Sequence, residues 1–303
     1  MIYDIDGNAL VIPSSGTTEN ILVASVLDAD SDGARFTAMK QLLDIGKKKL
    51  NNPSAVISDS EFTYATKGAV CALPLGNTGM YERYPFDMLY TKNADTQAVP
   101  ASVTKVMSLI TGMDYLSDVK KVVTVNSSDL VGGSGAYFSA GDTMTIEEVM
   151  LSMALPSSNT CAQVFARICG AKMLEAEGTT TYTDAECRTK FVAKMNEKAS
   201  YIGMSNSTFV SASGLSINSA NNLSTASDLI QMMVEACSYP EILKVWNKKS
   251  YTISVGGTNP RSVKLDTTVT NTAIENAYYI FGGKTGSLTS PRAAALVMVA
   301  RIK

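Results

Sequence analysis

The sequence predicts an α/β (α+β) fold, in which one mainly antiparallel sheet is built from both ends of the chain and flanked by helices. Period-two apolar patterns near both ends and helical spacing through the middle are the observations behind this prediction. Strands at both ends with helices between them imply a shared sheet. With 303 residues, 45% of them hydrophobic, the chain can bury a sizeable core. We expect a sheet part over about 34–100 and 250–303 and a helical part over about 101–249.

The first hundred residues are expected to supply an extension, a helix and two strands. Residues 1–33 are rich in Ser, Thr, Gly and Asp around one short apolar run, 21–27, which predicts a loosely structured N-terminal extension. Helical spacing of apolar residues predicts a helix over 33–50. Residues 68–75 and 86–92 then form two expected strands joined by a Gly-rich loop.

The middle of the chain is predicted to be mainly helical. Its expected helices span 103–116, 145–153, 160–168, 191–202 and 225–237. Pro100 stands just before the first of them, so Ser102 falls in that helix's first turn. Ser224 is the expected N-cap of the last helix. A short strand is expected over 122–125.

The last fifty residues return to period-two patterns. Two strands, 251–255 and 262–265, flank a Gly-rich turn as a hairpin, and two further strands cover 278–283 and 293–302. We expect residues 68–92 and 262–302 to lie in one mainly antiparallel sheet.

Composition excludes several classes of function. The sequence contains no histidine, which removes Ser-His-Asp and Cys-His catalysis as well as zinc sites that need imidazole. A net charge of -2 and a pI near 5.4 give no basic footprint, so nucleic acid is not an expected partner. The five cysteines form no CxxC pair and are expected to be small buried hydrophobes. Any activated nucleophile must therefore rely on a lysine or a carboxylate as its base.

Three short motifs occur along the chain, and their order carries information about function. Ser102 and Lys105 form S-x-x-K, a spacing that places hydroxyl and amine on one helix face. Residues 157–159, Ser-Ser-Asn, form S-x-N, and residues 284–286, Lys-Thr-Gly, form K-T-G. Each motif alone is weak, but together they are the signature of class A β-lactamases and penicillin-binding proteins.

With these motifs the sequence resembles the penicillin-binding D-alanyl-D-alanine carboxypeptidase family over roughly residues 66–300. Further similarity lies in 93–95, 141–145, 191–196, 203–204, 213–215 and 223–229. The resemblance implies a β-lactamase/transpeptidase-like catalytic domain over 34–303 and no cofactor or metal. It also implies peptidoglycan stem peptides ending in D-Ala-D-Ala as substrates, β-lactams as covalent inhibitors, and an extracytoplasmic location.

Three features depart from the family pattern, and one is the extension before Gly33, which the resemblance does not explain. Family members usually carry export signals, and the acidic start of this chain shows no signal peptide, so association with a membrane stays open. The family's fold closes with a further strand and a helix after the strand that follows K-T-G. We expect this part to be cut short or rearranged here.

The resemblance also implies a role for each motif residue. Ser102 attacks the carbonyl of the penultimate D-Ala, Lys105 accepts its proton, and Ser157 passes a proton to the leaving amine. Asn159 orients Lys105 and a substrate amide, and the backbone N–H groups of Ser102 and Ser287 form the oxyanion hole. Lys284 and Thr285 hold the terminal carboxylate, and Gly286 lets the substrate backbone approach.

Lys105 can act as a base only if its pKa falls from about 10.4 toward about 7, a change worth about 4 kcal/mol. A second cation about 4 Å away supplies about 4 kcal/mol at an effective dielectric near 20, so Lys284 together with desolvation is sufficient.

Three alternatives remain at this stage. A class A β-lactamase needs a deacylating glutamate with an Asn four residues on; Glu197 is the nearest candidate, but Tyr201 stands at that place. A β-lactam sensor module would stay acylated, and an inactive scaffold would only retain the motifs. Hydrolysis and transpeptidation cannot be distinguished from the residues.

Overall fold

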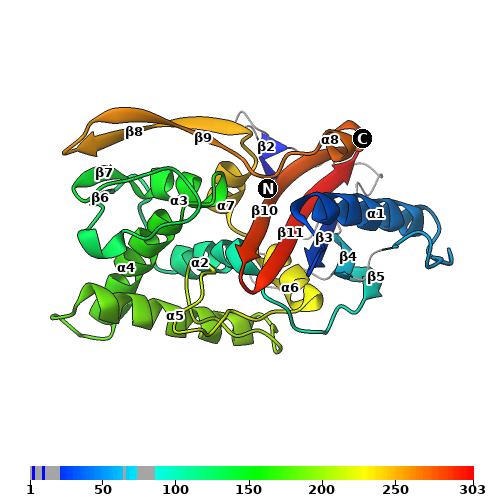
Figure 1. The fold of residues 1–303 in the computed structure, drawn as a ribbon, viewed down its shortest axis with the longest axis horizontal. Helices are drawn as coiled ribbons and strands as arrows, with labels where there is room; N and C mark the ends of the chain where they lie inside the picture. Colours follow the sequence, from blue (N-terminus) through cyan, green and yellow to red (C-terminus); the bar gives the residue numbers. More distant parts are fainter. Residues whose placement is uncertain (1, 4–8, 11–20, 64–65, 74–85) are drawn as a thin grey trace.

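The computed structural model describes residues 2–3, 9–10, 21–63, 66–73 and 86–303. Its main sheet has five strands, in the spatial order β10 (Tyr278–Thr289), β11 (Arg292–Ile302), β3 (Ile21–Leu27), β4 (Lys67–Leu73) and β5 (Asp87–Lys92). All neighbouring pairs are antiparallel. Strands from both ends of the chain therefore lie side by side (Figure 1), which confirms the predicted α/β fold with a mainly antiparallel sheet.

The apolar run 21–27 is the central strand β3 of this sheet. All seven of its residues are buried, and it pairs with β11 on one side and β4 on the other. The interpretation of this run as part of a loose extension was wrong: it is a strand covered on both faces, and its one polar side chain, Ser25, donates to the Ala226 carbonyl oxygen at 2.7 Å. We propose that the catalytic domain begins at or before Ile21 rather than at residue 34. The first twenty residues lie outside the described part, except the paired strands β1 (Ile2–Tyr3) and β2 (Ala9–Leu10).

Strand β3 also occupies the free side of β11. Strand β11 can pair with a neighbour on each of its two edges, and β10 occupies one of them. A strand that followed β11 in a hairpin would pair with the other edge. In this chain β3 pairs with that side, in register from Val26 opposite Leu296 to Ile21 opposite Arg301. The strand next to β11 is thus drawn from before the K-T-G strand and not from after it.

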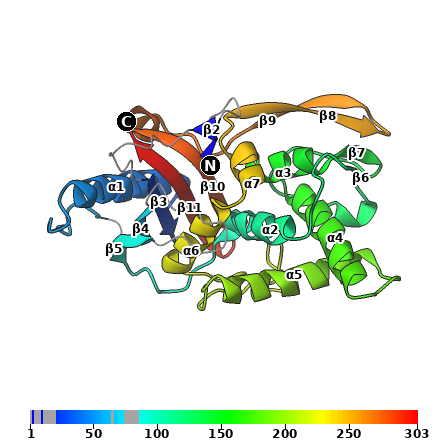
Figure 2. The same ribbon diagram turned by 180° about the vertical axis from the view of Figure 1, so that it is seen from behind.

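Helices cover both faces of the main sheet. Helix α1 (Asp32–Asn51), predicted over 33–50, packs on one face, and α6 (Ala226–Ala236) packs on the other (Figure 2). Alternate side chains of β3 divide accordingly: Leu22, Ala24 and Val26 join the core on the α1 side, whereas Ile21 and Val23 join the core on the α6 side. This alternation is the period of a strand with two buried faces.

The helical part matches the predicted helices closely. It contains the short 3-10 turn η1 (Ala101–Val103), α2 (Thr104–Met113), η2 (Ser127–Asp129), α3 (Ile146–Ala154), α4 (Asn159–Ala176), α5 (Asp184–Tyr201) and α7 (Pro240–Trp246). A last helix, α8 (Thr272–Ala277), precedes β10. The N-cap of α6 is Thr225 and not the predicted Ser224, because Thr225 Oγ1 accepts from the Asp228 N–H at 3.1 Å whereas the Ser224 hydroxyl bonds to Ser207.

A second sheet holds the predicted hairpin. Its order is β6 (Val122–Thr124), β7 (Asp142–Thr145), β8 (Ser250–Gly257) and β9 (Arg261–Asp266). We expected residues 262–265 in the main sheet, and this prediction was wrong because they lie in the second sheet. The hairpin extends over the helical part in Figure 1. Specific contacts hold it there: Arg261 forms an ion pair with the buried Asp142 of β7 at 2.8 Å, and the Ser254 N–H donates to Glu148 at 3.0 Å.

Candidate active site

Ser102 lies in the η1 turn, wedged between β10 and the loop around residue 214. A Cβ on Gly286 would stand 2.3 Å from the Pro100 carbonyl oxygen, and a Cβ on Gly214 would stand 2.0 Å from the Ala101 carbonyl oxygen. Two glycines therefore permit the close approach of three backbone segments at the nucleophile. The resemblance implied that Gly286 admits the substrate backbone; in the structure Gly286 lies against the turn that carries Ser102.

Lys105 and Ser102 are in contact. Lys105 Nζ lies 2.8 Å from Ser102 Oγ, and its two other partners at 2.8 Å are Asn159 Oδ1 and the Ser213 carbonyl oxygen. The last two atoms can only accept, so a neutral amine donates its two N–H groups to them. Its lone pair then faces the Ser102 hydroxyl, as a base that removes the hydroxyl proton requires. Ser213 entered the sequence analysis only as part of the family resemblance, without a role.

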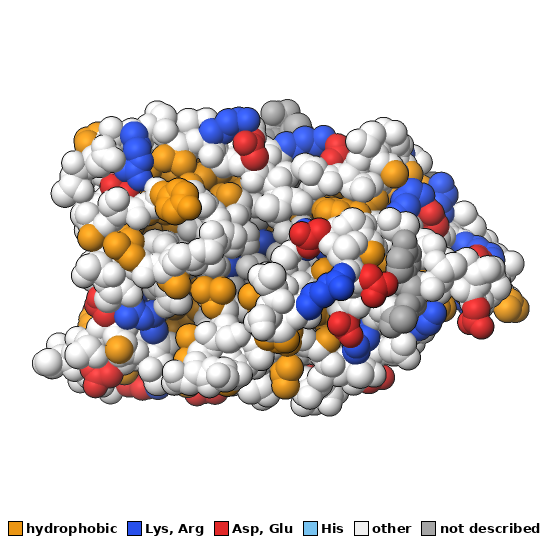
Figure 3. All heavy atoms as spheres, viewed as in Figure 1, with side chains coloured by type: hydrophobic (Ala, Val, Ile, Leu, Met, Phe, Trp, Pro, Cys, Tyr) orange, Lys and Arg blue, Asp and Glu red, His pale blue; other side chains and the backbone are white. Residues whose placement is uncertain are grey.

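Two buried lysines and an arginine determine the electrostatics of the site. Lys105 and Lys284 are 0% and 1% exposed. Burial, followed by the charge of Lys284, holds the pKa of Lys105 well below its usual value. Burial, followed by the charge of Arg35, lowers the pKa of Lys284 to about 7. Figure 3 shows Lys and Arg side chains recessed near the middle of the face that it presents. The site thus favours an unprotonated amine at Lys105 and an anionic ligand beside Lys284.

The S-x-N motif reaches the same place from the start of α4. Asn159 donates through Nδ2 to the Gly132 carbonyl oxygen at 3.1 Å, which fixes its Oδ1 toward Lys105. Ser158 caps α4 by accepting from the Cys161 N–H. Ser157 adopts a left-handed backbone conformation, with φ of 69°, and its buried hydroxyl has no hydrogen-bond partner among the described residues. A strained residue with an unsatisfied buried hydroxyl is well suited to bond a ligand.

The K-T-G motif lies in the middle of β10. Lys284 Nζ donates to the Thr285 carbonyl oxygen at 2.9 Å, so its influence on Lys105 is electrostatic. Thr285 Oγ1 shares a hydrogen bond of 2.6 Å with Thr268 Oγ1. Of the eight residues that the sequence proposed for the site, Ser102, Lys105 and Asn159 are linked directly by hydrogen bonds, and the K-T-G strand packs against the turn that carries Ser102.

Arg35 of α1 is a site residue that the motifs did not reveal. Its Nη1 donates to the Gly286 carbonyl oxygen at 3.0 Å and to Ser287 Oγ at 2.7 Å, and it pairs with Asp32 at 2.9 Å. Ser287 Oγ donates in turn to Asp32 at 2.7 Å. Arg35 thus anchors the peptide group whose N–H belongs to Ser287. One signal was available in the sequence: Arg35 occupies a position of the apolar stripe that also contains Ala38, Met39 and Leu42.

Replacing Arg35 with leucine is expected to slow acylation of Ser102 by penicillin about tenfold, because a misplaced Ser287 N–H weakens oxyanion stabilisation. The pKa of Lys284 should also rise, since the nearby positive charge that lowers it is removed. Acylation rates measured across about pH 5 to 10 report both effects. Lys47→Leu, at an exposed position of the same helix, is the control. An unchanged rate and pH profile in Arg35→Leu would show that Arg35 does not position the strand.

Comparisons with known proteins give one consistent group of relatives. A family model described as D-alanyl-D-alanine carboxypeptidase matches residues 85–303. The D-alanyl-D-alanine carboxypeptidase DacF of Bacillus subtilis (strain 168) is 29% identical over 190 residues, which are 61% of this chain and 42% of that protein. The D-alanyl-D-alanine carboxypeptidase of Streptomyces sp. (strain K15) is 28% identical over 207 residues, covering 66% of this chain and 67% of that protein. The D-alanyl-D-alanine endopeptidase of Pseudomonas aeruginosa is 27% identical over 162 residues, covering 53% of this chain and 46% of that protein. The chain thus spans about half the length of the curated relatives that it matches.

Solved structures support the fold. The Streptomyces K15 DD-transpeptidase superposes with a TM-score of 0.60 at 23% identity, covering 71% of this chain and 84% of that one. A penicillin-binding protein homolog from Mycobacterium tuberculosis gives a TM-score of 0.57 at 21% identity, covering 71% and 78%. The family match extends over more than half of the chain and includes the S-x-x-K, S-x-N and K-T-G motifs. The chain belongs to the D-alanyl-D-alanine carboxypeptidase family.

Proposed function

We propose that this protein is a serine-type D-alanyl-D-alanine carboxypeptidase that acts on peptidoglycan stem peptides through an acyl-enzyme on Ser102. The observation that carries the proposal is the placement of Lys105. Its buried amine lies 2.8 Å from Ser102 Oγ, its pKa is lowered, and its other two partners are obligate acceptors. This arrangement supplies a base without histidine.

Each step uses groups of the described site. Ser102 Oγ attacks the carbonyl carbon of the penultimate D-Ala while Lys105 takes its proton, and the N–H groups of Ser102 and Ser287 stabilise the developing oxyanion. The C–N bond breaks as Ser157 passes a proton to the leaving D-Ala amine. Asn159 orients Lys105 and a substrate amide. Lys284 and Thr285 hold the terminal carboxylate, for which the cationic site is suited. Water then resolves the ester.

The alternatives have less support. Glu197, the nearest candidate for a deacylating glutamate, lies on α5 with its side chain 61% exposed and paired with Lys194 at 2.6 Å. It is therefore bound at the surface, which disfavours class A-like hydrolysis of β-lactams. A sensor module would share acylation but not turnover of peptides, and an inactive scaffold would show neither.

Substrate and location follow from the same proposal. Peptidoglycan stem peptides and β-lactams are the expected partners, nucleic acid is not, and an enzyme of peptidoglycan acts outside the cytoplasm. In the part of the chain that the structure describes, no helix is both long and apolar enough to span a bilayer.

Penicillin G is expected to add its mass covalently to the protein at Ser102, and Ser102→Ala is expected to acquire no adduct. Intact-protein mass spectrometry over time measures both. Release of D-Ala from a peptide ending in D-Ala-D-Ala, assayed beside it, separates an enzyme from a sensor, which stays acylated, and from a scaffold. An adduct that persists in Ser102→Ala would place the nucleophile elsewhere.

A further inference from the structure

Trp246 contacts β10 directly before the K-T-G motif. It is the last residue of α7 and the single tryptophan of the sequence, and it is 4% exposed. Its indole N–H donates to the Gly283 carbonyl oxygen, and a Cβ on Gly282 would stand 2.7 Å from its ring. The Gly283 carbonyl shares one planar peptide group with the Lys284 N–H. Trp246 therefore fixes the peptide group at which the motif begins.

Strand β10 needs such a contact because it lies at an edge of the main sheet. In the described part of the chain its one neighbour in this sheet is β11, so its other edge has no strand ladder to hold it. The pairing with β11 is also irregular between Ile280 and Gly282, shortly before the motif. An irregularity of this kind re-aims the residues that follow it. Contacts from outside the sheet must therefore fix the direction in which the Lys284 side chain leaves the strand.

The K-T-G motif is held at both of its ends. Trp246 donates to the Gly283 carbonyl oxygen directly before the motif, and Arg35 donates to the carbonyl oxygen of Gly286, its last residue, at 3.0 Å. Each residue of a chain has only two soft dihedral angles. Fixed peptide groups on both sides therefore leave little freedom to the lysine and threonine between them. A displacement at either end would move the buried amine of the motif.

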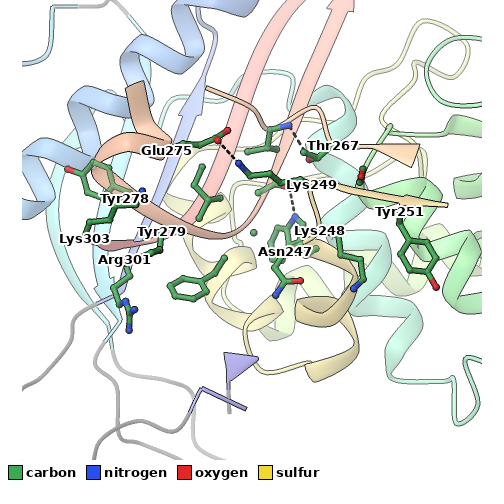
Figure 4. A pocket seen from close by; sticks show the side chains of 17 residues that line it. Asn247, Lys248, Lys249, Tyr251, Thr267, Glu275, Tyr278, Tyr279, Arg301 and Lys303 are labelled. Atoms are coloured by element: carbon green, nitrogen blue, oxygen red, sulfur yellow. Dashed lines mark hydrogen bonds and ion pairs between the residues drawn. The ribbon is translucent and has the colours of Figure 1, made fainter. Parts of the chain in front are cut away.

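The end of α7 that carries Trp246 is itself anchored near β10. The Thr267 N–H donates to the Lys249 carbonyl oxygen at 2.9 Å, and Lys249 Nζ pairs with Glu275 of α8 at 2.6 Å. Figure 4 shows the Lys249 and Glu275 side chains pointing toward each other in a pocket of about 720 Å³, which Trp246 also lines. Because this pocket leaves space beside the indole ring, the hydrogen bond to Gly283 is needed to hold the ring against the strand.

We propose that Trp246 is a positioning residue, which holds β10 so that Lys284 and Thr285 meet the carboxylate of the substrate. The inference rests on the proposed function, in which these two residues hold that carboxylate. Trp246 acts through the Gly283 peptide group and not by contact with the substrate. Loss of the indole N–H should therefore weaken recognition of a carboxylate selectively. Attack by Ser102 on a compound without that carboxylate should be almost unaffected.

A matched pair of β-lactams measures this effect on acylation alone. Penicillin G carries a carboxylate, and its methyl ester presents the same β-lactam ring without that charge. In Trp246→Phe, which keeps an aromatic ring but has no N–H donor, we expect the second-order rate constant for acylation of Ser102 to fall about tenfold with penicillin G and to stay within about twofold with the ester. Gly282→Ala, whose Cβ would displace the ring from the strand side, should give the same selective loss. Intact-protein mass spectrometry at timed intervals gives both rates.

Ile242→Val is the control for a purely structural effect, since Ile242 is 0% exposed on the same helix. Both of its rates should stay within about twofold of the parent. Equal losses with the two β-lactams in Trp246→Phe and Gly282→Ala would show that Trp246 only supports the fold, and unchanged rates would show that it does not position the motif. Either result would overturn the proposal.

The parent protein reports on the proposed function separately. If it formed no penicillin adduct, or reacted equally fast with penicillin G and the ester, the roles assigned to Ser102 or to Lys284 and Thr285 would be wrong. A parent that prefers penicillin G, together with variants that keep the full preference, would refute the positioning role of Trp246 alone.

Discussion

Replacing Lys105 with methionine is expected to slow acylation of Ser102 by penicillin at least about 10³-fold, because the only described group placed to take the hydroxyl proton is removed. Lys105 Nζ is the side-chain nitrogen in contact with Ser102 Oγ among the described residues. Stopped-flow acylation kinetics measure the loss. A Lys105→Met variant that acylates at the parental rate would leave the mechanism without its base.

The pH dependence of folding stability distinguishes a catalytic role of Lys105 from a structural one. The folded-state pKa of Lys105 is lowered, so the unfolded chain binds more protons between the folded pKa and the usual value near 10.5, and stability rises with pH across that window. Lys105→Met removes this dependence. We therefore expect stability to rise less steeply with pH in the variant than in the parent across this window. Urea unfolding at several pH values measures the two slopes, and equal slopes would show that Lys105 does not titrate there.

The same titration predicts the pH profile of the parent enzyme. Protonation of Lys105 removes the lone pair that faces Ser102, so acylation should fall as the pH drops through the lowered pKa of this amine. The low-pH limb should be absent from the residual rate of Lys105→Met.

An aspartate in place of Val23 is expected to prevent stable folding, at a cost of more than about 4 kcal/mol, because it buries an unpaired carboxylate. Val23 is 0% exposed at the centre of β3, between Cys71 of β4 and Val299 of β11. Urea unfolding followed by circular dichroism measures the loss. Val122→Asp is a matched control, since Val122 is 60% exposed and lies on the edge strand β6.

The outcome discriminates between two views of the first thirty residues. If Ile21–Leu27 were a dispensable extension, Val23→Asp would unfold at the same urea concentration as the parent. Unfolding at markedly lower urea, with Val122→Asp unchanged, is what a central strand requires.

The contact between the candidate site residues Ser102 and Lys105 could be predicted from the sequence because their spacing is local. Ser102 and Lys105 stand one helical turn apart, and residues 157–159 lead into α4, which Ser158 caps and Asn159 begins. If the two motifs act together, Asn159 must contact Lys105, and the distance from Lys105 Nζ to Asn159 Oδ1 is 2.8 Å. Motif residues therefore carry most of the information about where the reaction occurs.

Features that depend on partners distant in sequence could not be predicted. The pattern of 250–266 indicates a hairpin, but nothing in it distinguishes β7, with which β8 pairs, from an edge strand of the main sheet as the neighbour of that hairpin. The run 21–27 is too short for its periodicity to separate a loop insertion from a fully buried strand. Arg35 reaches Gly286 across 251 positions of sequence. In each case the local residues permit several neighbours, and only tertiary packing selects one.

The position of β3 has a consequence for how the chain acquires its fold during synthesis. The ribosome delivers β3, α1 and β4 early, yet the strand that covers the other side of β3, β11, is separated from it by about 270 positions of sequence, as in the pairing of Val26 with Leu296. Pairing over so long a loop is slow to form. Until β11 is made, the middle of the future sheet presents an apolar strand with one unpaired row of backbone N–H and C=O groups, which is a template for pairing with other chains. We therefore expect β3 of the nascent protein to need shielding until β11 is made, and the pairing of β11 with β3 to complete the middle of the sheet.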